Sequence, residues 1–231
     1  MKRPELRPAL LDNLRRQPHR DTALQRYARL AHDYESATAK IREVRRRAID
    51  RLALRVGETV FDVACGAGSM LADMAFHVGP PGRVIGIEQS PAMAALARAA
   101  ISGIAQAEVQ VAAVEDFVAP HPADALVLMY AHDVQQNPAA LARVFAQARP
   151  GARVVAAGLC LLPWWGWPIN AWVLWGARHY LTTWHGLRRP WQPLLDWCPD
   201  LAVVERFHDG TTYLATGTFS PRSTSLREPP Q

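Results

Sequence analysis

Cysteine and lysine are both scarce in this chain, and each scarcity excludes a class of protein. The three cysteines, Cys65, Cys160 and Cys198, are too few for a disulfide framework and lack the spacing of metal ligands. We therefore expect no metal site and a reducing, cytoplasmic setting. Only two of the 26 basic residues are lysine, so arginine carries the formal charge of +5, as compositional bias would produce.

Long apolar runs are also missing. The N-terminal residues 1–7 are charged and no apolar segment follows them, which argues against a signal peptide. Residues 154–177 carry no formal charge, but Pro163, Gly166 and Pro168 interrupt them. We therefore expect no membrane-spanning helix here, while contact with a membrane surface through the tryptophans of this region stays open.

Basic residues are concentrated at the start of the chain, where residues 1–51 contain 14 Lys/Arg and seven Asp/Glu. Such a segment could meet nucleic acid, an anionic membrane or an acidic carrier protein, or it could be a solvated helix face. The tryptophans further along are interleaved with Leu, Ile, Val and Pro rather than with Lys and Arg, which argues against a base-stacking surface. We expect no nucleic-acid partner.

The most informative segment is an apolar run that leads directly into a glycine-rich turn, Cys65-Gly66-Ala67-Gly68. Glu88 follows 20 residues after Gly68, at the end of a second apolar run. A strand that stops at such a turn lets a ligand approach bare backbone. An acidic residue at the tip of the next strand can accept hydrogen bonds from both hydroxyls of a ribose. Together these features indicate a nucleoside-binding α/β domain.

Two ligands suit such a site, a dinucleotide and S-adenosylmethionine. The dinucleotide fingerprint Gly-x-Gly-x-x-Gly fails at its third glycine, because that position is Leu71. Asp62 would repel a pyrophosphate, whereas its carboxylate suits a ligand that carries an ammonium and a sulfonium. The pattern therefore favours S-adenosylmethionine.

Residues 61–69, Phe-Asp-Val-Ala-Cys-Gly-Ala-Gly-Ser, resemble motif I of class I S-adenosylmethionine-dependent methyltransferases, and residues 86–93 resemble their acidic-loop motif. The resemblance covers about residues 55–219. The Asp-Tyr-Glu segment at 33–35 and the small size resemble the quinone C-methyltransferase group and its small-molecule relatives. The family uses S-adenosylmethionine and releases S-adenosylhomocysteine. Strand four lacks the Asn/Asp-Pro-Pro-Tyr motif of base- and glutamine-directed members.

The resemblance implies a Rossmann-like α/β fold: a seven-stranded, mostly parallel sheet with a terminal antiparallel hairpin and a tryptophan-rich helical lid. We expect an N-terminal arm and helical cap at 1–53, a methyltransferase domain at 54–219 with a lid insert at 160–197, and a disordered tail at 220–231. The expected strands are 59–63, 84–88, 109–113, 124–130, 153–158, 201–206 and 211–219. The expected helices are 22–53, 70–76, a helix from Pro91 capped by Ser90, and 138–148, with a turn at Pro150-Gly151.

The resemblance also assigns the cofactor contacts residue by residue. Asp62 would face the ammonium, Glu88 the ribose, and the residues after strand three the adenine. The family often has Asp or Asn at the position of Ala113, which weakens the adenine assignment. The full expected set is Asp62, Ala64, Cys65, Gly66, Gly68, Glu88, Gln89, Met93, Val114, Glu115, Tyr130 and Ala131.

Two residues are catalytic candidates. His132 directly follows strand four and could remove a proton from the acceptor near neutral pH, or it could simply pack beneath the cofactor. Tyr34 lies before motif I, where this family often places a tyrosine over the cofactor, or it packs within its helix.

All eight tryptophans lie between residues 160 and 197. They could wall an apolar or aromatic acceptor pocket, or bury themselves against the sheet. Trp164, Trp165, Trp184 and His185 are the expected acceptor contacts.

The sequence favours methyl transfer to an oxygen, nitrogen or carbon of a largely apolar or aromatic small molecule, plausibly in secondary metabolism. The alternatives are methylation of a lipid head group or quinone at a membrane surface, donation of another group from the sulfonium, and a non-catalytic cofactor-binding protein. An exposed tryptophan surface would also favour a homodimer.

Overall fold

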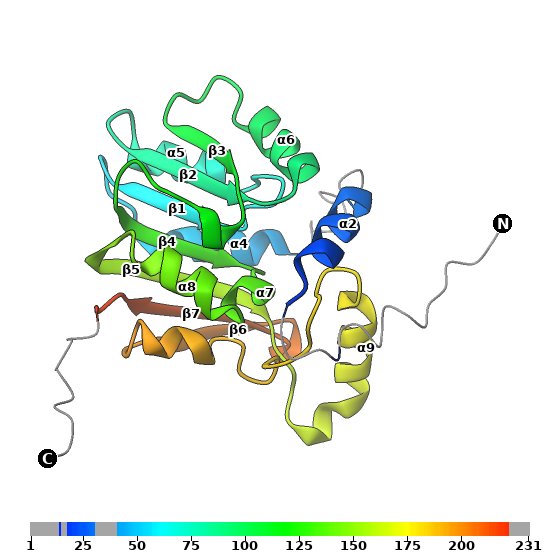
Figure 1. Cartoon of the computed structure of the whole chain (residues 1–231). Helices are drawn as coiled ribbons and strands as arrows, with labels where there is room; N and C mark the ends of the chain where they lie inside the picture. Colours follow the sequence, from blue (N-terminus) through cyan, green and yellow to red (C-terminus); the bar gives the residue numbers. More distant parts are fainter. Residues whose placement is uncertain (1–13, 15–17, 31–40, 222–231) are drawn as a thin grey trace, which may run out of the picture.

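A computed structural model describes residue 14 and residues 18–30 and 41–221. Seven strands form one sheet in the order β3-β2-β1-β4-β5-β7-β6, parallel except for β7, which runs antiparallel to its neighbours β5 and β6 (Figure 1). The strands are β1 (Thr59–Val63), β2 (Arg83–Glu88), β3 (Ala107–Val111), β4 (Ala123–Met129), β5 (Ala148–Leu159), β6 (Ala202–Phe207) and β7 (Thr212–Thr218). The expected fold class is confirmed.

Helices cover both faces of the sheet. One apolar cluster joins β1, β2 and β4 to α4 (Arg42–Leu52), α5 (Leu71–Val78) and α6 (Pro91–Ala100). The opposite cluster joins the sheet to α8 (Pro138–Phe145) and to the 3₁₀ turns η2 (Val114–Asp116) and η4 (Gln192–Asp196). β1 and the inner part of β4 are buried along their length, as expected of central parallel strands.

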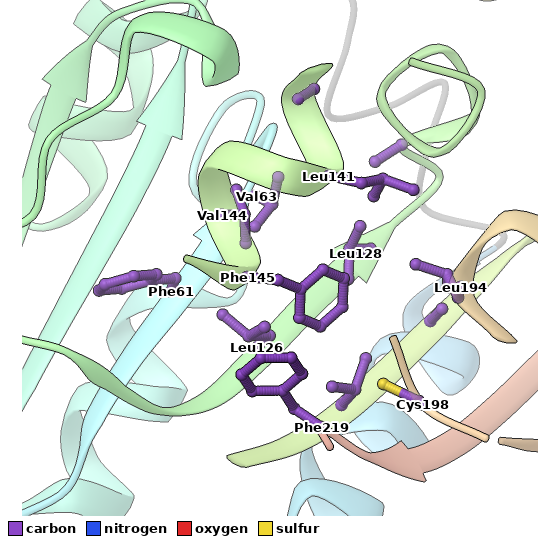
Figure 2. Packing of buried hydrophobic residues seen from close by; sticks show 14 of the residues in the cluster. Phe61, Val63, Leu126, Leu128, Leu141, Val144, Phe145, Leu194, Cys198 and Phe219 are labelled. Atoms are coloured by element: carbon purple, nitrogen blue, oxygen red, sulfur yellow. The ribbon is translucent and has the colours of Figure 1, made fainter. Parts of the chain in front are cut away.

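Phe145 at the end of α8 anchors the second cluster. Figure 2 shows its ring next to Leu126 and Leu128 of β4 and close to Phe219. The Phe145 ring also stacks on Trp197 with centroids 5.0 Å apart and an interplanar angle of 7°. Trp191 packs on Tyr213 of β7 at 4.9 Å. Two of the eight tryptophans therefore belong to the core rather than to a lid.

Most predicted elements are found with small shifts. β1 has the predicted bounds, and Ser90 caps α6 by accepting a hydrogen bond from the Met93 amide. β3 begins two residues earlier than predicted. The predicted turn at Pro150-Gly151 is wrong, because β5 continues through these residues as a bulge, with Ala123 opposite Ala148 but Ala125 opposite Arg153.

Three of the five arginines of α4 are paired with acidic residues. Arg46 contacts Glu43 at 2.9 Å, and Arg51 and Arg47 contact Glu205 of β6 at 2.7 and 3.2 Å. This part of the arginine-rich segment is therefore a solvated, ion-paired helix face.

α2 (Arg20–Leu30) docks against the insert that follows β5. The insert contains η3 (Trp164–Gly166) and α9 (Trp167–Ala177) and lies beside α2 at the edge of the molecule (Figure 1). Tyr27 donates its hydroxyl proton to the Tyr180 carbonyl at 3.0 Å, and Arg26 donates to the Arg178 carbonyl at 3.1 Å. In the part of the chain that the structure describes, no helix is long and apolar enough to cross a membrane.

Candidate functional site

The candidate site lies where the strand order reverses, between β1 and β4. In an open parallel sheet this is the point at which ligands bind, beyond the carboxyl ends of the strands. Both strands end there in non-glycine residues with left-handed backbone, Ala64 at φ 59° and Tyr130 at φ 52°. Such a conformation costs about 1–3 kcal/mol and persists where the surroundings enforce it, often at functional sites.

Glu88 ends β2 and is held in place by backbone amides. Its two carboxylate oxygens accept hydrogen bonds from the Gly66 amide at 3.0 Å and the Ser90 amide at 2.7 Å. Burial raises the pKa of Glu88, while these amides lower it. Each oxygen retains a second lone pair, so the carboxylate can still accept hydrogen bonds from a ligand.

Asp62 lies inside β1 and is buried. The pKa of Asp62 is raised to about 7, chiefly by burial; the positive charge of Arg45 lowers it, and the negative charge of Glu88 adds a smaller upward shift. Asp62, Arg45 and Ser69 line a small cavity of about 20 Å³ beside the glycine-rich turn. A buried carboxylate and an arginine at one small cavity suit a ligand group that carries both an ammonium and a carboxylate.

A larger cavity of about 120 Å³ lies at the carboxyl ends of β1, β2 and β4. It is bounded by the glycine-rich turn, the η2 segment, the start of α7 (His132–Gln135), α2 and the insert. The structure brings eight predicted cofactor residues together around it, namely Ala64, Gly66, Glu88, Gln89, Val114, Glu115, Tyr130 and Ala131. Cys65, with Asp62, lines the small cavity instead.

The structure does not place Gly68 and Met93 on a cavity wall. Gly68 instead permits close packing of the turn on α6, because a Cβ there would lie 2.9 Å from Ala97 Cα. Met93 is completely buried within α6. The structure therefore shows a packing role for these two residues, and their contact with the cofactor stays a prediction.

A second cavity of about 330 Å³ adjoins the first. Apolar and aromatic side chains of α9 and the insert form much of its wall, with His208, Thr211 and Thr212 of the β6–β7 hairpin on another side. Five residues line both cavities: Tyr27, Tyr130, His132, Tyr180 and Leu181. The two cavities therefore share one wall.

His132 belongs to this shared wall and is only 5% exposed. The backbone of His185 lies near the ring and partly opposes the pKa shift, but neither ring nitrogen has a partner at hydrogen-bonding geometry among the described residues. Burial lowers the pKa of His132 to about 4, so the imidazole is neutral near pH 7. A buried imidazole without a partner needs an explanation, and a bound ligand would supply one.

The neighbouring Asp133 ties three elements together. Its carboxylate accepts hydrogen bonds from the Thr182 amide at 3.1 Å and the Thr182 hydroxyl at 2.6 Å. The same hydroxyl oxygen accepts from the His19 amide at 3.0 Å, just before α2. Burial raises the pKa of Asp133, and the bonds from Thr182 oppose that shift. These hydrogen bonds thus fix α2 and the insert against the carboxyl end of β4.

The acceptor contacts expected from sequence are not assembled. Trp164 and Trp165 are exposed on η3 and line neither of these two cavities, so the structure does not bring them to the site and their contact with the acceptor stays a prediction. Trp184 packs against the small apolar cluster around Leu181, and the His185 side chain lies outside both cavity walls. Trp172 is the tryptophan that reaches the second cavity.

Sequence reasoning missed Arg45 and the hairpin residues around His208. Arg45 sits in a run of arginines without a spacing that distinguishes it from its ion-paired neighbours. His208 lies in the β6–β7 hairpin and lines the second cavity because the chain reverses there. No pattern in the neighbouring sequence marks it as a cavity residue. The other catalytic candidate, Tyr34, lies outside the described residues. Among the described residues no cluster of His, Cys, Asp or Glu could hold a metal ion.

Comparison with known proteins bears on this geometry. Residues 60–151 match the family described as "Methyltransferase domain", which spans the β1 to β5 region. By this match, residues 60–151 form a methyltransferase domain, and the strand order of the sheet is the one typical of class I S-adenosylmethionine-dependent methyltransferases. The cofactor of this family is S-adenosylmethionine, and its product is S-adenosylhomocysteine.

Two curated proteins match this chain over part of their length. A 2-phytyl-1,4-naphtoquinone methyltransferase of Thermosynechococcus vestitus is 31% identical over 141 residues, which cover 58% of this chain and 63% of the relative. An uncharacterized protein in a Streptomyces fradiae transposon is 33% identical over 128 residues, 53% of this chain and 36% of that protein. The chain thus spans less than two thirds of either relative.

Solved structures share the fold of this chain. The N-methyltransferase NodS of Bradyrhizobium japonicum, in complex with S-adenosyl-l-homocysteine, superimposes with a TM-score of 0.63 at 16% identity. The match covers 87% of this chain and 100% of NodS. At this identity the likeness concerns the fold alone.

Proposed function

We propose that this protein transfers a methyl group from S-adenosylmethionine to an oxygen, nitrogen or carbon of a largely apolar small molecule. The observation that supports this most directly is the wall shared by the two cavities. A donor in the first cavity and an acceptor in the second would meet at Tyr130 and His132. Positioning two reactants in this way is the main task of such an enzyme, because the cofactor is already activated.

The residues around the first cavity fit the cofactor. Glu88 would accept hydrogen bonds from the ribose hydroxyls, with its orientation set by the Gly66 and Ser90 amides. Asp62 would pair with the ammonium and Arg45 with the carboxylate of the methionine part, since both line the small cavity. Val114 and Glu115 would border the adenine. When bound, the cofactor supplies an electrophilic methyl group on a sulfonium.

His132 would accept the proton that the acceptor gives up. Its ring faces both cavities, and it is neutral near pH 7 because burial lowers its pKa to about 4. A ring nitrogen that no described residue occupies can take a proton without first breaking another hydrogen bond. Tyr27, Tyr180 and Leu181 would close the wall around the reacting groups and exclude water.

The chemistry of the second cavity supports an apolar acceptor. Leu159, Trp172, Val173 and Ala177 line it, while its polar groups gather at the His132 end and at the hairpin. The name of the Thermosynechococcus relative, a naphtoquinone methyltransferase, agrees with such an acceptor. A role in secondary metabolism and a cytoplasmic location remain part of this proposal.

Calorimetric titration of S-adenosylmethionine and S-adenosylhomocysteine, with NADH as control, tests the cofactor assignment. We expect micromolar binding of the first two ligands and none of NADH. A screen of aromatic and amphiphilic acceptors with the labelled methyl donor then tests turnover. Binding without turnover on any acceptor class would favour a non-catalytic cofactor-binding protein.

His132→Ala separates proton transfer from packing. We expect turnover to fall by about 10²-fold or more, in the range of lost general-base catalysis, with cofactor affinity nearly intact. His132→Gln keeps most of the side-chain volume and should be impaired to a similar degree. Normal turnover in the Gln variant would show that His132 only packs beneath the cofactor.

A further inference from the structure

The outer face of the insert is a continuous exposed tryptophan surface. We define it by Trp164, Trp165 and Trp167 around η3 and by Trp172 and Trp175 on α9. Their exposed fractions range from 49% to 78%. Ile169 on the same helix is also exposed, and only Val173 and Ala177 of α9 are buried. A contiguous apolar surface of this kind on a folded protein marks an interaction site.

We propose that this tryptophan surface docks on a lipid bilayer and that the apolar acceptor enters the second cavity from the membrane. α9 is apolar on all sides, yet no described segment buries its outer side. Tryptophan is the side chain that best occupies the boundary between water and hydrocarbon, because its ring is apolar and its N–H is polar. The helix is short, so it would lie on the membrane rather than span it.

The charges in the sequence of the insert fit an anionic lipid layer. From residue 160 to residue 195 the chain contains three arginines, Arg178, Arg188 and Arg189, and no Asp or Glu. Arg178 directly follows α9, and its guanidinium lies 4.0 Å from the centre of the Trp175 ring. A cation beside exposed tryptophans is suited to the head-group layer, where lipid phosphates lie above the hydrocarbon.

The tryptophan surface is also continuous with the second cavity. Trp172 contributes to both, and Val173, Gly176 and Ala177 on the inner side of α9 line the cavity. One helix would therefore contact lipid with its outer side and the acceptor with its inner side. The helix is held firmly for this purpose, because the Asn170 side chain exchanges two hydrogen bonds with the Leu162 backbone, at 2.8 and 2.9 Å.

Vesicle flotation of the full chain tests the docking. The probes are phosphatidylcholine vesicles with and without phosphatidylglycerol, in the absence of cofactor. We expect binding that increases with phosphatidylglycerol, and we expect brominated lipid to quench the tryptophan fluorescence of the bound protein. Trp164→Ala combined with Trp167→Ala should weaken partitioning by about tenfold or more, since two large rings lose apolar burial.

Phe76→Ala is the matched control, because Phe76 is an aromatic side chain on α5 that is 84% exposed and lies outside the tryptophan surface. It should bind vesicles like the wild type. Equal binding by the double tryptophan variant, or no binding by the wild type, would overturn the proposal. Self-association that the double variant abolishes would overturn it in favour of a second copy of this chain as the partner.

Delivery of the acceptor from the membrane rests on the proposed function, whereas docking does not. S-adenosylhomocysteine affinity of the double variant should equal that of the wild type, because neither Trp164 nor Trp167 lines a cavity. Docking with no cofactor binding would refute the proposed function alone. Cofactor binding with no docking would refute only this inference.

Discussion

The proposed ribose contact depends on the carboxylate of Glu88. Glu88→Ala removes a buried acceptor that also holds the Gly66 and Ser90 amides. We expect S-adenosylhomocysteine to bind at least about tenfold more weakly, equivalent to about 1.4 kcal/mol, as measured by calorimetry. Glu88→Gln keeps one acceptor oxygen and should bind with intermediate affinity. Wild-type affinity in the Ala variant would remove the ribose assignment.

The raised pKa of Asp62 predicts that cofactor affinity depends on pH. Its pKa is raised to about 7 by burial, so in the ligand-free protein it becomes protonated as pH falls below 7. A ligand ammonium favours the carboxylate, so cofactor affinity should rise with pH up to about 7. Below that, the expected loss is up to roughly tenfold per pH unit. Asp62→Asn should bind more weakly and show no such slope. A wild-type affinity that is independent of pH between 5 and 8 would contradict the pairing.

The same shift predicts an effect on stability. The folded-state pKa of about 7 exceeds the ordinary value of 3.8, so the folded protein binds more protons between these limits. The contribution of Asp62 to stability is therefore full below about pH 4 and is lost as pH rises toward 7. As the pH rises from about 4 to 7, the free energy of unfolding of ligand-free Asp62→Asn should accordingly decrease less than that of the wild type. Urea titrations at several pH values measure the difference.

Among the elements, the contact of the glycine-rich turn with α6 is the most tightly specified. Gly68 has φ 76°, and a Cβ there would lie 2.9 Å from Ala97 Cα and Cβ. Gly103 also has positive φ, at 84°, but a Cβ there would meet nothing within 4 Å. Gly68→Ala should therefore destabilise the fold by about 2 kcal/mol more than Gly103→Ala, because only the first adds a clash to backbone strain. Equal losses in urea unfolding would show that the contact relaxes freely.

The sequence predicted elements best where a local chemical signal defines their ends. β1 ends at the glycine-rich turn, and α6 begins with Ser90 as cap and Pro91 as first residue, so both were placed correctly. β3 lies at the sheet edge and is buried mainly at Val109, so its apolar pattern is weak and its start was missed by two residues. Pro150-Gly151 looks like a turn from composition, but it forms a bulge within β5, because β4 pairs with Ala148 and Arg153 on either side of it and the Gly151 amide donates to the Phe219 carbonyl.

The insert shows what the sequence could not resolve at the scale of the whole molecule. Eight tryptophans in one segment predict an apolar region but not its partition, because α9 is apolar on all sides and has no periodicity to mark an inner face. The structure divides them. Trp191 and Trp197 pack on the sheet side of the core, and Trp184 packs against the apolar cluster around Leu181. The five around η3 and α9 are exposed, although Trp172 also lines the second cavity. Tertiary packing decides which tryptophan side chains line the second cavity, so the sequence alone does not predict the composition of its wall.

The first cavity is closed by three distant parts of the chain, and this leads to a prediction about the whole molecule. Pro18, His19 and Tyr27 from the α2 region, Glu88 from the sheet and Tyr180 and Leu181 from the insert all line it. Binding of S-adenosylhomocysteine should therefore slow amide hydrogen exchange at 19–27 and 180–182 as well as in the glycine-rich turn, because the ligand stabilises all three together.

Two comparisons make that measurement specific. β6 lines none of the cavities described above, so its exchange should not change on ligand binding. Thr182→Val removes the hydroxyl that joins Asp133 to the His19 amide, at 2.6 and 3.0 Å. In this variant, protection by the ligand should persist in the glycine-rich turn but decrease in α2 and the insert. Protection confined to the turn in the wild type would instead mean that α2 and the insert do not close over the cofactor, because ligand contact with them would necessarily stabilise their amides.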